Sequence, residues 1–376
     1  MRILWIPHTG WHIPQRAHLF CRALAERHEV HVTDWIADFE TIRDYMSWRY
    51  IRNFRYRYRR EGNIHIHGIP RFSPAIFSRF LRQMNYNIYQ RYVQKIVDER
   101  QIDVVVGTFI AGPPTGVKIV LDIFDDNPAY WREFRGNEAL AQEVQDSEAL
   151  WAQKSDHIVT ISTVLKDKFA DKVAGTEITI IPNGVHIDRF KRADGQKIRE
   201  AYGLGDKRVV GFVSSMGEFV GLQLYMEAIR ALNRPEVMHF VVGDGPALPA
   251  ARRYAEEHGL SNVKFAGWIK SEQVADYFAA LDVGVIPFDL ANFTHSAFPI
   301  KLVEYLACQI PVVSTPLEEI KRLAFPGVLL AEPEAGAFAR GMAEALDMRL
   351  EAEHQLERYA HANLVAEYEA ILEGLL

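Results

Sequence analysis

Short apolar runs alternate with helical patterns along the chain, and this alternation limits the possible fold more than any other feature. Residues 2–7 and 29–33 are predicted strands, and residues 15–27 between them carry apolar side chains at helical spacing. A strand, a loop, a helix and a second strand form a βαβ unit with a right-handed crossover. The loop containing Gly10 should therefore lie at the carboxyl ends of the strands, where open α/β sheets bind ligands.

The second half of the sequence repeats this pattern. Strands are predicted at residues 208–214, 239–242, 263–265, 283–287, 311–314 and 328–330, with helices between them. A chain of 376 residues is too long for one ordinary core, so two doubly wound α/β domains are expected. Polar residues after 185 place the boundary there. We predict domains at 1–185 and 186–355, with a helical tail at 356–376.

Composition and charge exclude several classes of protein. Apolar residues make up 48% of the chain, which suits sizeable cores, and the net charge of −6 argues against a general nucleic-acid binder. Cys21 and Cys308 lie in apolar helical patterns and are expected as buried thiols of a reducing compartment. No apolar run approaches the ~20 residues that span a bilayer, and no signal peptide is evident. A cytoplasmic location is therefore expected.

One stretch, residues 293–315, combines a loop, a short helix and a buried strand. Pro299 suits a first helical turn, where backbone N–H groups have no intrahelical partner. Lys301 and Glu304 lie three residues apart and share one helix face. Free N–H groups with a lysine suit a phosphate, and a glutamate suits sugar hydroxyls. Taken alone, this pair is also explained as a surface ion pair.

Asp125 and Asp126 follow a predicted strand at residues 118–124. Carboxylates at a strand's carboxyl end are candidates for a general base or a sugar ligand. Capping and turn chemistry explain the same residues, because Asp-Asn-Pro favours turns. His65 and His67 alternate with apolar residues in a predicted strand. They are expected to form its polar face and not a metal site, since no Cys or carboxylate stands at ligand spacing nearby.

The segment from Arg43 to Arg60 interleaves arginines with aromatic residues. Arginines that meet lipid headgroups beside interfacial aromatic rings would make it a surface for an anionic membrane. A nucleic-acid patch is a second reading, disfavoured by the acidic remainder of the chain. A solvated amphipathic helix that packs its aromatic side chains on the domain is the third.

Taken together, the motifs resemble the GT-B-fold glycosyltransferases of family 4, which move a sugar from a nucleotide-diphosphate donor to an acceptor. The resemblance covers most of the chain. A subgroup with a Pro-x-Lys-x-x-Glu-Tyr donor-site helix is the most similar. The ordered landmarks are Thr9-Gly10, Ile181-Pro-Asn-Gly-Val-His-Ile-Asp-Arg-Phe190, Gly243-Asp-Gly-Pro246, Phe265-Ala-Gly-Trp268, and Pro299-Ile-Lys-Leu-Val-Glu-Tyr305 with Ile310-Pro-Val-Val-Ser314.

The resemblance implies two Rossmann-like domains facing a cleft, with a C-terminal helix that crosses back to the first domain. It also implies roles for particular residues. Glu304 would hold the donor ribose, and backbone N–H groups near Phe298, Pro299 and Ile300 would meet the diphosphate. Trp268 would lie by the base. The strand-end loops add Gly10, Ser215 and Gly243 to the expected donor site, and Trp11 and His12 are candidates for acceptor binding.

The sequence departs from the family at three places. Many members carry a glutamate eight residues before Glu304, where this chain has Ser296, which we therefore also expect in the donor site. Many carry Arg and Lys after the first strand of the second domain, and here Lys301 would supply the missing charge. Many place a histidine where this chain has Asp125 and Asp126. The aspartates keep an inverting route open, whereas the family likeness favours retention.

We therefore predict transfer from a nucleotide sugar, a UDP-sugar in the first instance, to a glycan or lipid-linked acceptor. Lys301, Asp125 and Asp126 are the candidate catalytic residues, and no metal or other cofactor is expected. A sugar-nucleotide epimerase of the same fold is the rival enzyme. A non-catalytic protein that binds nucleotide sugars or membrane surfaces is the rival from another class. A dehydrogenase is disfavoured because the Gly10 loop lacks a Gly-x-Gly-x-x-Gly pattern.

Overall fold

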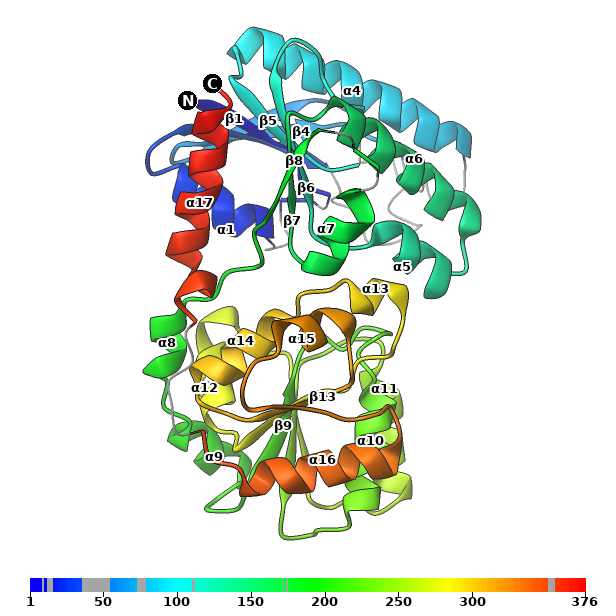
Figure 1. The fold of residues 1–376 in the computed structure, drawn as a ribbon, viewed down its shortest axis with the longest axis vertical. Helices are drawn as coiled ribbons and strands as arrows, with labels where there is room; N and C mark the ends of the chain where they lie inside the picture. Colours follow the sequence, from blue (N-terminus) through cyan, green and yellow to red (C-terminus); the bar gives the residue numbers. More distant parts are fainter. Residues whose placement is uncertain are drawn as a thin grey trace.

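The computed structural model contains two α/β units, each built on its own sheet (Figure 1). The first sheet ends with β8, and the second begins with β9. Two doubly wound domains are therefore confirmed. The limits 1–185, 186–355 and 356–376 remain our proposal. The structure describes residues 1–8, 10–11, 16–35, 55–72, 79–109, 112–170, 172–173, 175–350 and 356–376.

The first sheet has the order β3-β4-β2-β1-β5-β6-β7-β8 and is parallel except for β3. Its central strands are almost entirely apolar, as expected for strands covered on both faces. The strands are β1 (Arg2–Trp5), β2 (Glu29–Trp35), β3 (Arg57–Glu61), β4 (Ile64–Ile69), β5 (Val104–Gly107), β6 (Lys118–Ile123), β7 (His157–Thr160) and β8 (Glu177–Ile180).

Helices cover both faces of this sheet. Side chains of α4 join the core beside Leu4 and Ile6, whereas α1 and α17 pack on the opposite face beside Ile3 and Trp5. The sheet is thus closed from water on both sides. The helices are α1 (Arg16–Leu24), α4 (Arg79–Arg100), α5 (Asn127–Glu133), α6 (Glu138–Lys154) and α7 (Thr163–Ala170).

The second sheet is wholly parallel, with the order β11-β10-β9-β12-β13-β14. Its strands are β9 (Val209–Val213), β10 (Met238–Val242), β11 (Val263–Gly267), β12 (Val283–Ile286), β13 (Val312–Ser314) and β14 (Val328–Leu330). The accompanying helices are α8 (Ile187–Lys191), α9 (Gln196–Tyr202), α10 (Leu222–Leu232), α11 (Leu248–Glu257), α12 (Val274–Ala279), α13 (Asn292–His295), α14 (Ile300–Ala307), α15 (Glu318–Leu323) and α16 (Ala335–Asp347).

The carboxyl ends of the two sheets face each other. Helix α5, which follows β6, contacts α13, which follows β12; likewise α7 after β7 contacts α15 after β13 (Figure 1). The expected ligand-binding edges of both sheets therefore meet at one junction between the units.

The C-terminal helix α17 (His361–Gly374) returns to the first unit and runs beside α1 (Figure 1). Its Tyr368 ring packs against Phe20 and Trp5 in the core of that unit. The predicted crossing of the tail is therefore confirmed.

Several local predictions need correction. Arg57–Glu61 forms the edge strand β3, antiparallel to β4, so the amphipathic-helix reading is wrong for this part. The cause is a period of two in the side chains, Arg57 and Arg59 alternating with Tyr56 and Tyr58, which is the spacing of a strand. The arginines from Arg43 to Arg52 lie outside the described residues. Cys21 is a buried thiol as predicted, and Cys308 is partly exposed. Among the described helices, none is long and apolar enough to cross a bilayer.

Candidate functional site at the junction of the two units

Helix α14 is fixed firmly on the second sheet. Pro299 is its N-cap, with extended backbone angles, and leaves the first turn open. Leu302, Val303 and Leu306 are buried beneath the helix. The Tyr305 hydroxyl donates to the Gly211 carbonyl at 3.0 Å, so the helix is tied to β9 by a buried hydrogen bond. The start of α14 therefore has a fixed position at the junction.

Lys301 and Glu304 stand on the part of α14 that the core does not cover, and both are half-buried. The Lys301 Nζ lies 4.6 Å from the centre of the Phe288 ring, just beyond β12. Burial lowers the pKa of Lys301 and raises the pKa of Glu304, and the charge of each residue opposes the shift of the other. Two partly desolvated, opposite charges at a strand-end edge are suited to a polar anionic ligand.

The loops after β9, β10 and β11 form the rest of this edge. Gly243 has a φ of +129°, and a Cβ there would lie 1.7 Å from the Ser214 carbonyl oxygen. Only glycine fits this close approach of two loops. Ser215 is exposed next to it. Trp268 is 71% exposed at the end of β11, unusual for so large an apolar side chain.

Ser296 and Phe298 occupy closed positions. The Ser296 hydroxyl donates to the Phe293 carbonyl at 2.9 Å, and its own carbonyl accepts a 2.6 Å hydrogen bond from the Ser162 hydroxyl. Phe298 is buried and stacks on Tyr359. Both side chains are thus used in packing, while Ile300 remains half-buried at the start of α14. Ser296 was predicted in the donor site; in the structure it is buried, joins the two units and does not occupy the open edge.

The two aspartates after β6 differ in environment. Asp126 is the N-cap of α5: its Oδ1 accepts from the Ala129 N–H at 3.1 Å and pairs with Lys168 at 2.5 Å. Asp125 makes no side-chain hydrogen bond to any described residue. Burial, with the neighbouring charge of Asp126, raises the pKa of Asp125 to about 7. Of the two, Asp125 has the free carboxyl group, and Asp126 has a capping role.

The loop after β1 is only partly described. Gly10 is buried at its start. Trp11 is 4% exposed, stacks on His18 at 3.8 Å between ring centres, and donates its backbone N–H to Asp34. Its ring therefore lies in the core and is not presented to solvent. His12 lies outside the described residues.

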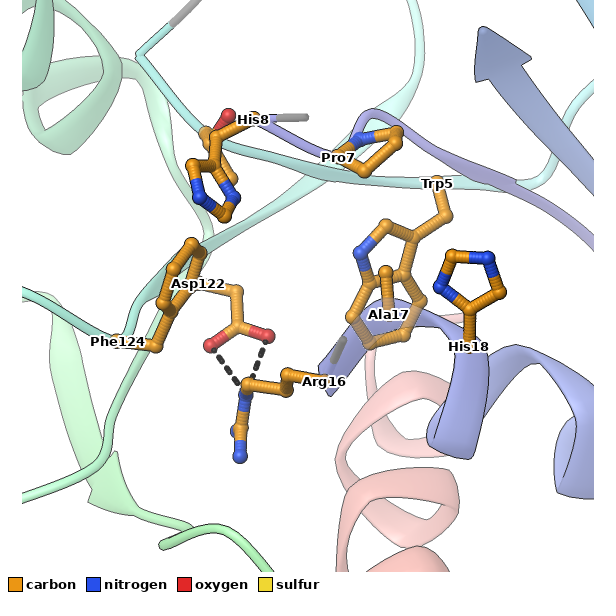
Figure 2. Close-up of a pocket in the computed structure, with 9 residues that line it drawn as sticks. Trp5, Pro7, His8, Arg16, Ala17, His18, Asp122 and Phe124 are labelled. Carbon is orange, nitrogen blue, oxygen red and sulfur yellow. Dashed lines mark hydrogen bonds and ion pairs between the residues drawn. The ribbon is translucent and has the colours of Figure 1, made fainter. Parts of the chain in front are cut away.

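A small pocket opens at the carboxyl ends of β1, β5 and β6 (Figure 2). The Arg16 Nε pairs with the Asp122 carboxylate at 3.1 Å on its floor. His8 packs on Phe124 at 4.4 Å between ring centres, and burial lowers the pKa of His8 to about 4. The lining residues are Trp5, Pro7, His8, Arg16, Ala17, His18, Thr108, Asp122 and Phe124.

The sequence-based prediction missed His8, Arg16 and Asp122. The available signal was position alone: His8 follows the first strand, and Asp122 lies inside the strand that precedes Asp125. A neutral imidazole at this edge can accept a proton or a hydrogen bond. The pocket therefore belongs to the first-unit side of the junction.

Each unit places one carboxylate at the start of a helix in the other unit. Glu133 of the first unit accepts from the backbone N–H groups of Asn292 and Phe293 at the start of α13. Glu319 of the second unit accepts from the backbone N–H groups of Thr163 and Val164 at the start of α7. Each unit thus caps a helix of the other, which holds the two sheet edges together.

Known families match both units. Residues 14–189 match the family described as Glycosyltransferase Family 4, and residues 207–348 match the family described as Glycosyl transferases group 1. Both units of the chain are therefore similar to domains of known glycosyltransferases. In this glycosyltransferase fold, the junction described above lies between the two matched domains.

The chain is also similar to individual glycosyltransferases, over about half of its length. The chain is 27% identical over 190 residues to a putative teichuronic acid biosynthesis glycosyltransferase of Bacillus subtilis, covering 49% of the chain and 46% of that protein. It is 29% identical over 168 residues to a GDP-mannose-dependent phosphatidylinositol monomannoside mannosyltransferase of Mycolicibacterium smegmatis, covering 43% and 44%. Each match spans less than half of the relative's length.

Solved structures confirm the GT-B fold over the full length. Sucrose-phosphate synthase from Thermosynechococcus elongatus superposes with a TM-score of 0.77 at 14% identity, covering 100% of this chain and 99% of that chain. HepE of Anabaena, solved in complex with UDP-glucose, superposes with a TM-score of 0.74 at 17% identity and covers 100% of both chains. At these identities the likeness concerns the fold.

Proposed function

We propose that this glycosyltransferase transfers a hexose from a nucleotide-diphosphate sugar to a glycan or lipid-linked acceptor. The observation that carries the proposal is the pair Lys301 and Glu304, half-buried on α14 at the edge where both sheets meet. Cations and helix N-termini bind phosphate, and a carboxylate binds sugar hydroxyls. Both kinds of group stand here within one turn of the same helix.

Charge development in the reaction explains the need for these groups. Breaking the bond between sugar and phosphate leaves negative charge on the nucleotide diphosphate. The Lys301 ammonium and the open N–H groups after Pro299 would stabilise that charge without a metal ion. Glu304 would accept hydrogen bonds from the donor ribose. Trp268, exposed beside the same edge, would lie against the base.

The acceptor hydroxyl must lose a proton during transfer. We propose retention, in which the departing phosphate accepts that proton on the same face of the sugar. Asp125 is the residue that would act as base in an inverting route, because its carboxyl group is free of side-chain partners among the described residues. Asp126 is less suited, since it pairs with Lys168. His8 and Arg16 line the pocket that would receive part of the acceptor.

The donor is proposed to be a UDP-sugar. The similar fold of HepE holds UDP-glucose, whereas the mycobacterial relative depends on GDP-mannose. A panel of UDP-, GDP- and dTDP-sugars, with product release measured in the presence of chelator, tests the nucleotide and the metal independence together. Turnover of a UDP-sugar in chelator is expected. Turnover only after adding a divalent cation would overturn the metal-free route.

Product analysis separates the alternatives. A transferase releases free sugar or glycosylated acceptor together with the nucleotide diphosphate, whereas an epimerase converts one nucleotide sugar into another without an acceptor. A binding protein would show affinity and no turnover. The glycosyltransferase proposal is wrong if the whole panel gives no nucleotide diphosphate.

We also propose that the arginine-rich segment up to Arg60 binds an anionic membrane surface from the cytoplasm. One arginine of this segment already forms an ion pair within the chain, because Arg59 pairs with Asp34 at 3.2 Å. Vesicles containing phosphatidylglycerol should retain the wild type and lose the triple variant Arg55→Ser, Arg57→Ser, Arg60→Ser. The exposed pair Arg230→Ser, Arg253→Ser on the second domain is the control. Equal retention of all three proteins would overturn the proposal.

A further inference from the structure

The face of the first sheet that packs on α4 carries a polar layer of three histidines at its β4 side. His31 of β2 is paired in register with His65 of β4, and Thr33 with His67. His31 and His67 are fully buried. The strand was predicted to turn His65 and His67 outward as a polar face. For His67 this is wrong, because α4 packs on that face and Tyr56, just before β3, contacts both His67 and Tyr92 of α4.

Hydrogen bonds fix the orientation of each ring. The Nδ1 of His31 lies 2.8 Å from the Nε2 of His67, whose Nδ1 lies 2.6 Å from the Tyr56 hydroxyl. The Nδ1 of His65 lies 2.6 Å from the Tyr58 hydroxyl. His31 and His65 therefore both use Nδ1 internally, and both direct Nε2 toward the same place.

That place is completed by a carboxylate. The Glu29 Oε1 lies 2.9 Å from the Nε2 of His31 and 4.0 Å from the Nε2 of His65. All three ligand atoms fall within 4.8 Å of one another. Ligand atoms around a tetrahedral zinc ion, with bonds of ~2.0–2.1 Å, stand roughly 3.3 Å apart. The Glu29 side chain is half-exposed at the start of β2, and a small movement of it would bring the three ligand atoms to this spacing.

We propose that Glu29, His31 and His65 form a binding site for a divalent transition metal, Zn²⁺ in the first instance, at the amino ends of β2 and β4. The fourth position would hold water. Two imidazoles and a carboxylate are common zinc ligands. The site lies at the opposite end of the sheet from the junction with the second domain, so it is separate from the proposed transfer reaction.

The hydrogen bonds of the ring nitrogens that face away from the proposed metal support this assignment. Histidines that bind metal hold their other ring nitrogen in a hydrogen bond, which sets the tautomer. With the His31 proton on Nδ1, His67 accepts it through Nε2 and donates from its own Nδ1 to the Tyr56 oxygen. In the reverse arrangement Tyr56 donates to the His67 Nδ1, His67 donates from Nε2 to the His31 Nδ1, and the His31 Nε2 carries the proton. Only the first arrangement leaves the His31 Nε2 free for a metal ion.

Neighbouring charges limit the strength of binding. Arg60 and Arg100 act on His65 with the same sign as a metal ion. We therefore expect affinity in the micromolar range, weaker than that of closed structural zinc sites. A second cluster of His28, Glu369 and Glu373 is a poorer candidate, because Arg27 and His28 already pair with the Glu369 carboxylate.

Calorimetric titration of the metal-free protein with ZnCl₂ tests the site. One ion per chain is expected, with affinity at least about tenfold weaker in Glu29→Gln and in His65→Ala. His258→Ala, at an exposed position on the second domain, should bind as the wild type does. Glu29→Gln keeps a hydrogen-bonding side chain at a half-exposed position, so its folding in chelator should match the wild type.

Two further readouts do not depend on calorimetry. Co²⁺ should give the intense visible bands of four-coordinate cobalt in the wild type and lose them in His65→Ala. Zn²⁺ at about one hundred times its dissociation constant should raise the melting temperature of the wild type by roughly 3–4 °C and leave Glu29→Gln unchanged. Equal zinc binding by wild type and both variants, or a pale six-coordinate cobalt spectrum, would overturn the proposal.

Discussion

Ser162 of the first domain donates its hydroxyl to the backbone carbonyl of Ser296 in the second domain at 2.6 Å. The same hydroxyl oxygen accepts from the Leu165 N–H at 3.1 Å and caps α7. One buried hydroxyl therefore serves a helix start and a contact between domains. The residue that replaces the family's expected glutamate is accordingly part of the closed junction.

Replacing this hydroxyl should weaken the protein measurably. Ser162→Ala removes the cap of α7 and leaves the Ser296 carbonyl without its donor, which costs about 1–3 kcal/mol. Calorimetric melting compared with Ser155→Ala is the measurement. Ser155 is also buried, but its hydroxyl bonds only within its own helix end. A smaller loss for Ser162→Ala than for Ser155→Ala would contradict the linking role.

Glu319 should control how firmly the domains close. Its carboxylate accepts from the Thr163 N–H at 2.9 Å and from the Thr163 hydroxyl at 2.7 Å, across the junction. Glu319→Gln removes the charge from these bonds, and we expect a larger radius of gyration in solution scattering. The control is Glu344→Gln, at an exposed position on α16, which should leave the radius unchanged. Identical scattering of both variants would show that this contact does not hold the domains together.

Asp125 should make stability depend on pH. Its pKa is raised from 3.8 to about 7 by burial and by Asp126, so the folded state retains a proton that the unfolded chain has lost. This contribution is complete below about pH 4 and is lost as the pH rises toward 7. Asp125→Asn should therefore melt higher than the wild type at pH 8 and equally at pH 4. The exposed Asp146→Asn should show no such difference, and parallel curves for Asp125→Asn would contradict the shift.

Trp268 should matter for the donor and little for folding. The side chain is 71% exposed, so Trp268→Ala should change the free energy of unfolding by less than about 0.5 kcal/mol. Stacking on a base contributes about 1 kcal/mol, which corresponds to a severalfold loss of donor affinity. Leu290→Ala, another exposed apolar position, is the control. Unchanged donor affinity in Trp268→Ala would remove this residue from the site.

Much of the fold follows from local pattern. The apolar runs at β9, β10 and β12 are short and rich in valine, which favours buried strands over helices. The Pro-x-Lys-x-x-Glu-Tyr spacing predicts the helix α14. These elements are encoded by neighbours in the sequence. The edge strand β3 was missed because its arginines suggested a solvated helix, although their alternation has the period of a strand.

Contacts between distant residues could not be predicted in this way. Glu29 and His65 lie close together only because β2 and β4 pair in the sheet. The spacing of residues in the sequence does not predict that these two strands are neighbours. The caps made by Glu133 and Glu319 depend on the orientation of two domains. The capping role of Asp126 was foreseen as an alternative, whereas the burial of Trp11 depends on its stacking with His18.

Donor binding to Glu304→Gln tests the central claim most directly. Calorimetric titration with UDP and with the UDP-sugar that supports turnover should give at least about tenfold weaker affinity than the wild type, because a charge-assisted hydrogen bond to the ribose is lost. The control Glu227→Gln, half-buried on α10, should bind as the wild type does. Affinity of Glu304→Gln equal to that of the wild type would contradict the assignment of the donor site to α14.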